Sequence, residues 1–319
     1  MRATGKRIKL SDRAELVRAA ALIRAGELVA FPTETVYGLG ANALDPAAVD
    51  KIYAAKGRPA TSPLIVHVDS IEMAKGLVLD WPSKAELLAR RFWPGPLTLV
   101  LPKQTHVPDR LTAGLATVGI RVPANELAIA LIREAGVPIA APSANRFTEL
   151  SPTTAEHVRE TMGDRVAMVL DGGPTTVGIE STVLSLAAPD AVLLRPGMVT
   201  QAEIEELIGP VRTAQPPDVG AHASPGMHPR HYSPRTPLVL ISGGQLPASG
   251  RGAYLWMNTR AAAARSFQMP ADPSGYARTL YGILHAADSE GWDWIAVERP
   301  PETPAWAAIR DRLERAASR

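Results

Sequence analysis

The chain of 319 residues contains no cysteine, which excludes disulfides, thiolate metal ligands and cysteine nucleophiles. Aromatic side chains make up only 5% of the residues, and the formal net charge is only +2. A charge this close to zero argues neither for nor against nucleic acid as a partner, so an RNA-binding surface would have to be a local basic groove. Composition alone therefore leaves the function open.

Long apolar segments are also missing. The sequence has no run of about 18 apolar residues, the length that a membrane-spanning helix requires. Residues 1–7, Met-Arg-Ala-Thr-Gly-Lys-Arg, lack the apolar stretch of a secretory signal. Neither secretion nor membrane insertion is indicated, and we expect a cytoplasmic protein.

What is present points to an α/β protein with two domains. Hydrophobic residues make up 46% of the chain, and 319 residues are enough for one large core and a smaller one. Predicted strands outnumber predicted helices and do not alternate strictly with them, which favours a mixed sheet over a regular doubly wound one. We expect a large domain over residues 1–210, with a twisted mixed sheet and flanking helices. A smaller α/β domain, Rossmann-like but without a Walker loop or Gly-x-Gly-x-x-Gly, is expected over residues 237–319.

The segment 211–236 between them has the composition of a linker. It contains five prolines, two glycines and three of the seven histidines of the chain, with little apolar periodicity. Its second half, residues 225–234, is too distinctive for a plain spacer, and long loops are often functional. No acidic or thiolate ligand joins the histidines, so we name no metal-ligating residue.

Two cations are predicted at the end of one helix. An apolar strand over residues 28–31 runs into a polar turn over 32–35, and a helix follows with Asp45 as N-cap and Gly57 just past its end. Lys56 and Arg58 therefore lie together at the helix C-terminus. Cations on a rigid scaffold suit a polyphosphate or a carboxylate, but complementing the helix dipole explains them equally well.

Other polar side chains interrupt or follow strands. His67 ends the apolar run from residue 64, and Arg121 lies on the face opposite Val118 and Ile120. Ser143 and Asn145 follow a strand predicted over residues 138–141. A structural histidine, a solvated arginine and ordinary turn residues would produce the same pattern, so spacing alone does not choose between scaffold and site.

A set of short motifs favours a functional site over a structural role for these residues. Across residues 30–197 they resemble, in the same order, those of the YrdC-type threonylcarbamoyl-AMP synthase family. They are Pro32-Thr33-Glu34-Thr35-Val36-Tyr37-Gly38-Leu39, Lys56-Gly57-Arg58-Pro59, Pro63-Leu64-Ile65-Val66-His67, Trp93-Pro94-Gly95-Pro96-Leu97-Thr98, Gly119-Ile120-Arg121-Val122-Pro123, Ala141-Pro142-Ser143-Ala144-Asn145, Ser181-Thr182-Val183 and Leu194-Arg195-Pro196-Gly197. The linker, with Pro225-Gly226-Met227 and His231-Tyr232-Ser233-Pro234, is similar to that of the long, two-domain form.

The resemblance implies an L-threonylcarbamoyladenylate synthase, a nucleotidyltransferase. Such an enzyme forms threonylcarbamoyl-AMP and pyrophosphate from L-threonine, bicarbonate and ATP, for the threonylcarbamoyl-adenosine modification of tRNA. Mg²⁺ is expected with ATP, held by phosphates and water, so no protein ligand is named. A separate tRNA threonylcarbamoyl-transferase is expected as the downstream partner, and tRNA itself is not expected to bind tightly.

The resemblance also implies roles for individual residues. The catalytic set would be Lys56, Arg58, Ser143 and Asn145, around the phosphates. ATP contacts would come from Lys56, Arg58, Ser62, Thr117, Ser143, Asn145, Ser151, Arg195 and Tyr232, with Tyr232 folding over the nucleotide as a lid. Threonine contacts would come from Thr35, His67, Arg121, Ala141 and Ser181, with Arg121 pairing with the substrate carboxylate.

One position departs from the family pattern. Ser62 stands where many relatives carry Asn, and a hydroxyl replaces only part of an amide's contacts.

Two other functions have to be weighed. A YrdC-like domain that only binds RNA would need dispersed Lys and Arg, whereas the full residue set favours the enzyme. Carbamoyl transfer in hydrogenase maturation would come with cysteine-containing zinc-finger segments, and this chain has no cysteine.

Overall fold

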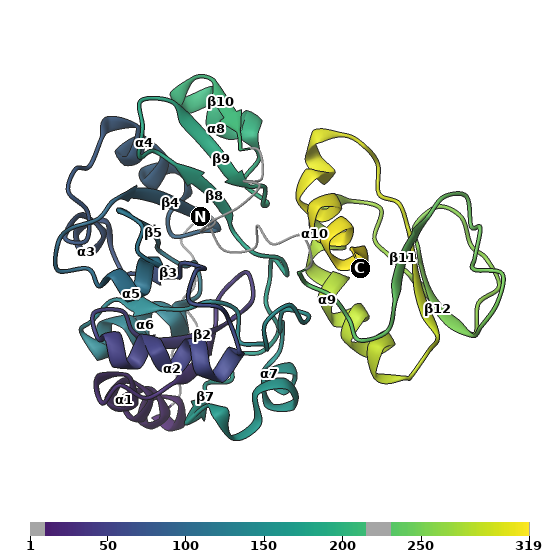
Figure 1. Cartoon of the computed structure of the whole chain (residues 1–319), viewed down its shortest axis with the longest axis horizontal. Helices are drawn as coiled ribbons and strands as arrows, with labels where there is room; N and C mark the ends of the chain where they lie inside the picture. The colour runs from purple at the N-terminus through teal and green to yellow at the C-terminus, as the bar shows by residue number, and fades with distance from the viewer. Residues whose placement is uncertain (1–9, 215–230, 319) are drawn as a thin grey trace.

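The computed structural model describes residues 10–214 and 231–318, with the backbone alone for residues 10–12. Within these ranges the chain forms a large α/β unit with a ten-stranded sheet and a smaller one with a four-stranded sheet (Figure 1). The predicted fold class is confirmed. The Pro225-Gly226-Met227 part of the predicted linker lies outside the described residues. No helix of the described ranges is both long and apolar enough to cross a bilayer.

The large sheet is mixed. Its strands are β1 Val29–Pro32, β2 Tyr37–Asn42, β3 Ile65–His67, β4 Leu97–Pro102, β5 Thr117–Arg121, β6 Ile139–Ala140, β7 Met168–Val169, β8 Thr182–Ser185, β9 Ala191–Arg195 and β10 Val211–Thr213. In space they follow the order β10-β9-β8-β4-β5-β3-β6-β2-β1-β7. The pairs β1–β2, β4–β5 and β8–β9 are antiparallel, whereas β3–β5 and β4–β8 are parallel.

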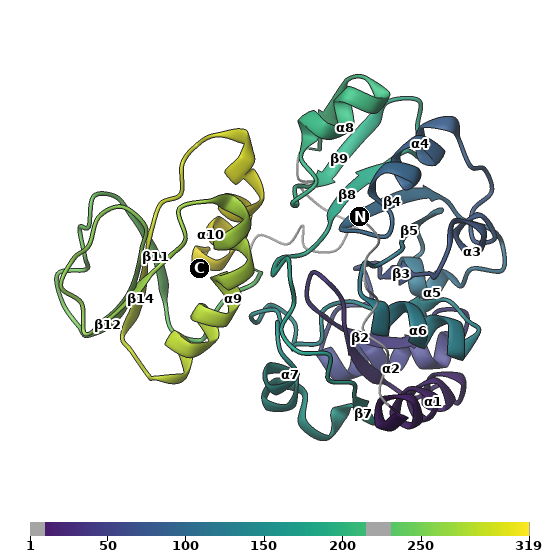
Figure 2. The same ribbon diagram turned by 180° about the vertical axis from the view of Figure 1, so that it is seen from behind.

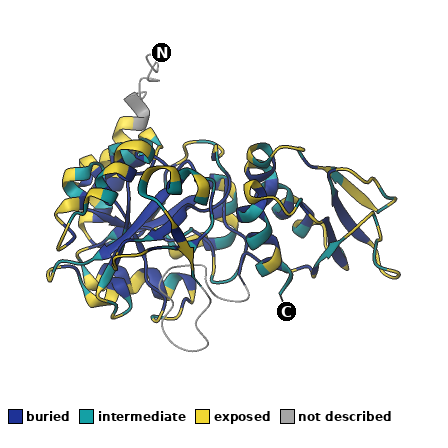
Figure 3. Cartoon of the chain, turned by 90° about the horizontal axis from the view of Figure 1, so that it is seen from above, coloured by how far each residue is buried: buried dark blue, intermediate teal, exposed yellow. Residues whose placement is uncertain are grey.

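Helices cover both faces of this sheet, so the strands are buried beneath helices with exposed outer surfaces (Figure 3). They are α1 Leu10–Arg24, α2 Pro46–Lys56, α3 Ile71–Lys75, α4 Ser83–Phe92, α5 Asp109–Thr112, α6 Glu126–Ala135, α7 Ala155–Met162 and α8 Gln201–Ile208, with a 3-10 turn, η1, at Gly163–Arg165. Alternate residues of β1 point to opposite faces. Val29 and Phe31 pack with α1 and α6, whereas Ala30 packs in the core that includes α2 and α4.

The small domain has an all-parallel sheet. Its strands are β11 Leu238–Ile241, β12 Gly252–Trp256, β13 Arg265–Gln268 and β14 Trp294–Glu298, in the order β11-β14-β12-β13. One face packs against α9 Pro273–Ser289 and α10 Ala307–Ala317, which is preceded by the 3-10 turn η2 Pro304–Trp306. Figures 1 and 2 show α9 and α10 between this sheet and the large domain.

The two domains share a hydrophobic core. Val36, Leu150, Ile179 and Tyr232 belong to the same buried cluster as the apolar residues of α9 and α10. Segments close to the active-site motifs are thus packed against the helices of the small domain.

The structure adds to the sequence-based prediction at two points. Gly38 and Gly40, which follow the polar turn predicted over residues 32–35, lie within β2. A side chain at Gly40 would place its Cβ 2.7 Å from the ring of Phe31, so this glycine permits a close approach between β1 and β2. In addition, β10 extends the large sheet to Thr213, three residues into the segment expected as linker.

Candidate active site

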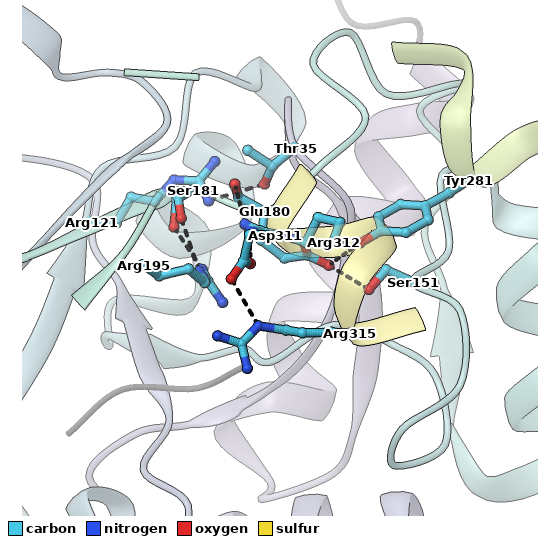
Figure 4. A network of polar contacts seen from close by, with 10 residues as sticks. All are labelled: Thr35, Arg121, Ser151, Glu180, Ser181, Arg195, Tyr281, Asp311, Arg312 and Arg315. Atoms are coloured by element: carbon cyan, nitrogen blue, oxygen red, sulfur yellow. Dashed lines mark hydrogen bonds and ion pairs between the residues drawn. The ribbon is translucent and has the colours of Figure 1, made fainter. Parts of the chain in front are cut away.

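Several strand ends of the large sheet meet at the candidate site. β3 and β5 are parallel and in register, so His67 and Arg121 lie side by side at their ends. The chain leaving β6 crosses next to them, with the Ala141 N–H donating to the Ile65 carbonyl at 2.9 Å. Figure 4 shows Arg121, Thr35, Ser181 and Arg195 converging here. The topology therefore gathers side chains that are far apart in the sequence.

Helix α2 delivers the two predicted cations. The Asp45 side chain caps its start by accepting from the Ala47 N–H, and Gly57 ends it in the left-handed conformation with φ 63°. Glycine adopts this conformation without steric cost, so the helix stops here. Lys56 consequently lies on the last turn and Arg58 immediately beyond it.

The ammonium group of Lys56 is buried against the loop that follows β6. It donates to the carbonyl oxygens of Ser143 and Asn145, both at 2.6 Å, and to Asn145 Oδ1 at 3.3 Å. These contacts match the three donors of an ammonium. Burial, together with the charge of Arg58, holds the pKa of Lys56 well below its usual range. Lys56 thus fixes the loop that carries the predicted phosphate-binding residues.

Arg58 points into the site with Ser62 behind it. Its Nη2 donates to the Ser62 hydroxyl and to the Pro63 carbonyl oxygen, the latter at 3.0 Å. Burial lowers the pKa of Arg58 to about 10, so the guanidinium keeps its charge at neutral pH. Ser62 is fully buried and lies outside the cavity lining, where it orients Arg58.

Arg121 is a further buried cation of the site. Its Nε donates to the Gly95 carbonyl at 3.1 Å and its Nη1 to Thr35 Oγ1 at 3.0 Å. Its Nη2 lies 2.6 Å from Glu34 Oε1, in charge contact but without the angle of a hydrogen bond. Both side chains of this ion pair are at least 94% buried. Glu34 is therefore the counter-ion of Arg121.

His67 is a neutral imidazole in this setting. Burial, and then the neighbouring charge of Arg121, lowers the pKa of His67 to about 3. Its Nδ1 is buried and has no hydrogen-bond partner among the described residues. A ring held neutral next to a guanidinium can orient a polar substrate group, but it is too weak a base to deprotonate an amine.

Ser181 and Arg195 form the third wall. Arg195 donates from Nε to the Ser181 carbonyl at 3.1 Å and from Nη2 to Ser181 Oγ at 3.2 Å. Thr98 Oγ1, on β4, lies 2.9 Å from the same Ser181 hydroxyl. The hydroxyl and the guanidinium are thus held in one orientation towards the cavity.

Tyr232 closes the site from the last part of the predicted linker, where the described residues resume at position 231. Its residue is only 1% exposed, and its backbone has the unusual positive φ of 59°. Burial raises the pKa of Tyr232, so the phenol stays protonated. The buried hydroxyl has no hydrogen-bond partner within the described ranges. An unpartnered donor at this position is suited to a bound ligand.

These walls enclose a cavity of about 520 Å³, including its open mouth. Nine of the predicted site residues line it: Thr35, Arg58, His67, Arg121, Ala141, Ser143, Ser181, Arg195 and Tyr232. Five do not: Lys56, Ser62, Thr117, Asn145 and Ser151. Lys56 and Asn145 hold the loop at Ser143, whereas Thr117 begins β5, about 13 Å along the strand from Arg121.

Sequence reasoning missed several residues of the site. Glu34 was visible inside the Pro-Thr-Glu-Thr motif, and Glu180 directly before Ser181, yet neither was assigned a role. Glu180 lines the cavity and pairs with Arg312 of α10, with Nε 2.7 Å from Oε2. No local pattern could have identified Arg312, because the two partners are 132 residues apart.

Known proteins share this architecture. Residues 21–197 match the family Sua5_yciO_yrdC, described as telomere recombination, and residues 199–318 match the C-terminal domain of threonylcarbamoyl-AMP synthase. A threonylcarbamoyl-AMP synthase of Bacillus subtilis is 45% identical over 95% of this chain and 93% of its own length. A threonylcarbamoyl-AMP synthase of Alkalilimnicola ehrlichii is 36% identical and matches 57% of this chain but 96% of its own length, so it is a shorter relative.

A solved structure agrees with these matches. The crystal structure of Pyrococcus abyssi Sua5 complexed with L-threonine is 41% identical in sequence, with a TM-score of 0.92 over 98% of this chain and 96% of that chain. The resemblance drawn from the motifs is confirmed across both domains. The chain therefore belongs to the Sua5/YrdC family of threonylcarbamoyl-AMP synthases, in its two-domain form.

Proposed function

We propose that this chain forms threonylcarbamoyl-AMP and pyrophosphate from L-threonine, bicarbonate and ATP, as a nucleotidyltransferase that supplies the threonylcarbamoyl-adenosine modification of tRNA. The observation that carries the proposal is one cavity lined by three guanidinium groups, those of Arg121, Arg58 and Arg195. We assign Arg121 to the substrate carboxylate and Arg58 and Arg195 to the phosphates. The threonine complex of the P. abyssi relative supports the amino-acid half.

The Arg121 end suits the amino acid. A guanidinium with Thr35, His67 and Ser181 in the same cavity wall offers donors and acceptors for a carboxylate, an amine and a hydroxyl. The backbone at Ala141 forms the remaining side. Because Arg121 already carries Glu34 as counter-ion, threonine would share or replace that carboxylate.

The remaining cations of the cavity suit the nucleotide. Arg58 and Arg195 would neutralise the triphosphate and the departing pyrophosphate, and Ser143 would donate its hydroxyl. Lys56 and Asn145 would act behind that loop, and Ser62 through Arg58. Ser151 and Thr117 are kept as ATP contacts on the family pattern alone. Tyr232 would cover the nucleotide and keep water from the labile carbamate.

Mg²⁺ would accompany ATP and neutralise phosphate charge. The two buried carboxylates of the site are already engaged, Glu34 with Arg121 and Glu180 with Arg312. We therefore expect the ion to be held by phosphate oxygens and water, with no protein ligand named.

The proposed reaction balances in two steps. The threonine nitrogen bonds to the carbon of bicarbonate, a proton and a hydroxide leave as water, and a carbamate results. A carbamate oxygen then attacks the α-phosphorus of ATP, and the bond to the pyrophosphate oxygen breaks. With a pKa of about 3, His67 does not serve as the base for the threonine ammonium, so that proton passes to solvent or substrate.

The cellular setting follows from the substrates. ATP and bicarbonate are supplied in the cytoplasm, where we place the protein, and the absence of cysteine agrees with that location. The labile product is handed to a separate tRNA threonylcarbamoyl-transferase, so tight binding of tRNA to this chain is not required.

Pyrophosphate release tests the proposal. The chain is incubated with ATP, Mg²⁺ and bicarbonate, with and without L-threonine, and the products are examined by mass spectrometry. We expect threonine-dependent release and the mass of threonylcarbamoyl-adenylate. Arg121→Met should abolish the threonine dependence, whereas Arg133→Met, at a largely exposed arginine that pairs with Asp69, should not. Threonine-independent release, or none, refutes the proposal.

A further inference from the structure

The loop that leads into Ser181 is pressed against the small domain. Gly178 has φ +88°, and a Cβ at this position would lie 2.4 Å from the Ala277 carbonyl oxygen of α9. Beside it, Arg278 Nε donates to the Thr176 carbonyl at 3.0 Å. The backbones of the two domains therefore touch directly at this loop.

Glu180, two residues further on, is held by side chains from both domains. Ser151 Oγ of the large domain donates to Oε1 at 2.6 Å, and the Tyr281 hydroxyl of α9 lies 3.2 Å from Oε2. Arg312 of α10 completes the set through Nε, 2.7 Å from Oε2, and through Nη2, 3.3 Å from the Glu180 carbonyl oxygen. Figure 4 shows these groups converging on Glu180 from separate segments. We call these four residues, Ser151, Glu180, Tyr281 and Arg312, the Glu180 cluster.

Both members of the buried Glu180–Arg312 pair stay charged. Burial alone would raise the pKa of Glu180, but the charges of Arg312 and Arg195 and the hydrogen bonds outweigh it, so this pKa lies below its usual range. Asp311 adds a second carboxylate, 2.6 Å from Arg312 Nη1. The Arg312 side chain is completely buried. A buried ion pair adds little net stability to a domain contact, because the desolvation of the two charges offsets their attraction, and apolar residues of the same volume are often as stabilising.

Arg312 also reaches the lid. Its Cζ lies 5.2 Å from the centroid of the Tyr232 ring, within the range of a cation–π contact. The next turn of α10 supplies the Arg315 carbonyl, which accepts from the His231 N–H at 3.4 Å. One guanidinium thus bridges Glu180, in the cavity wall, and Tyr232, which covers the cavity.

We propose that Arg312 is a positioning residue of the active site, and that the small domain completes the site by supplying it. Arg312 fixes the position of Ser181 through the adjacent Glu180. It also packs against the Tyr232 ring and so keeps this ring over the cavity. The proposal rests on the function proposed above. It gives the small domain a defined role in turnover, beyond stabilising the large one.

The test compares two arginines of α10, Arg312 and Arg310, which lie two residues apart and on nearly opposite sides of the helix. Arg312→Met removes the bridge, whereas Arg310→Met is the matched control, because the hydrogen bonds that Arg310 makes among the described residues stay within the small domain, to the Pro301 and Thr303 carbonyls. The assay is kcat/KM for threonine-dependent pyrophosphate release. We expect Arg312→Met to lower it roughly tenfold to a hundredfold, the loss typical of a misplaced catalytic group, and Arg310→Met to leave it within twofold.

A double-mutant cycle separates positioning from general stability. Tyr232→Leu removes the aromatic face, and if Arg312 acts through Tyr232, adding this change to Arg312→Met should cost less than a further twofold. Losses that multiply, or a folded Arg312→Met with control-like kcat/KM, overturn the proposal. Should Arg312→Met not fold, Arg312→Lys keeps the charge but loses the planar fork, and wild-type kcat/KM in that variant also overturns it.

ATP binding by calorimetry distinguishes the two proposals. If the unaltered chain releases no pyrophosphate, the proposed function fails, but the positioning role still predicts weaker ATP binding in Arg312→Met than in Arg310→Met. Equal affinities in these two variants contradict the positioning role by itself.

Discussion

Replacing Arg121 by methionine removes the cation that balances Glu34 in the free protein and, in the proposed complex, the carboxylate of threonine. The residue Glu34 is 5% exposed, so the variant leaves a buried carboxylate without a partner. Breaking a buried pair in this way costs about 3–5 kcal/mol of the free energy of unfolding. For a domain of about 200 residues this corresponds to a melting temperature lower by roughly 6–20 °C.

A second substitution separates folding from binding. Glu34→Gln added to Arg121→Met removes both charges, and we expect it to restore more than half of the lost stability. Threonine affinity should stay low in both variants, by roughly tenfold to a hundredfold, because a charge-assisted hydrogen bond worth about 1.5–3 kcal/mol is gone. ATP affinity should change less than threefold.

Thermal melts and calorimetric titrations with threonine and ATP check these values, with Arg133→Met as the exposed control. If the double variant is as unstable as the single one, Glu34 is not the counter-ion that the 2.6 Å contact indicates. If the double variant binds threonine normally, Arg121 does not hold the substrate carboxylate.

Three further predictions concern the lid, the domain contact and pH. Tyr232→Phe removes a hydroxyl that is buried without a partner in the described ranges, so the melting temperature should stay equal or rise while kcat/KM falls; an unchanged kcat/KM would mean that the hydroxyl does not serve the ligand. Gly178→Ala forces its Cβ against α9 and should lower both activity and the melting temperature, whereas Gly163→Ala, with open space around its Cβ, tests the strain of a positive φ alone. Burial lowers the pKa of His285 to about 4, so the unfolded chain takes up this proton first as pH falls. The free energy of unfolding should therefore decrease between pH 6.5 and about 4, and His285→Gln, measured by urea unfolding at several pH values, should flatten that slope; an equal slope contradicts the assignment.

The fold was predictable where segments were long and strongly patterned. Apolar alternation identified β5 and placed Arg121 opposite Ile120, and the cap signals at Asp45 and Gly57 fixed α2 with Lys56 at its end. Strands of two residues, such as β6 and β7, are too short for a period to fix their bounds, and the strand predicted over residues 138–141 is only Ile139–Ala140 in the structure. β13 is largely exposed, so it lacks an apolar face to detect.

The site was predictable in its lining but not in its support. Motif order brought nine lining residues together, because the resemblance carries information about neighbours in space. The contact of Arg312 with Glu180 and Tyr232 could not be predicted from the sequence. Helix α10 is rich in Asp, Glu and Arg, which is typical of a solvent-facing helix. Arg312 is the charged residue of α10 that is buried, because it packs against Glu180 and Tyr232, and the sequence around it does not reveal that contact.

The ion pair between Glu180 and Arg312 also limits how the domains can be exchanged between relatives. A chimera that joins this large domain to a foreign second domain would bury the Glu180 carboxylate beside whatever residue replaces Arg312. The Glu180 carboxylate and the Arg312 guanidinium form one ion pair divided between two domains, so a graft that keeps the pair has to transfer both residues.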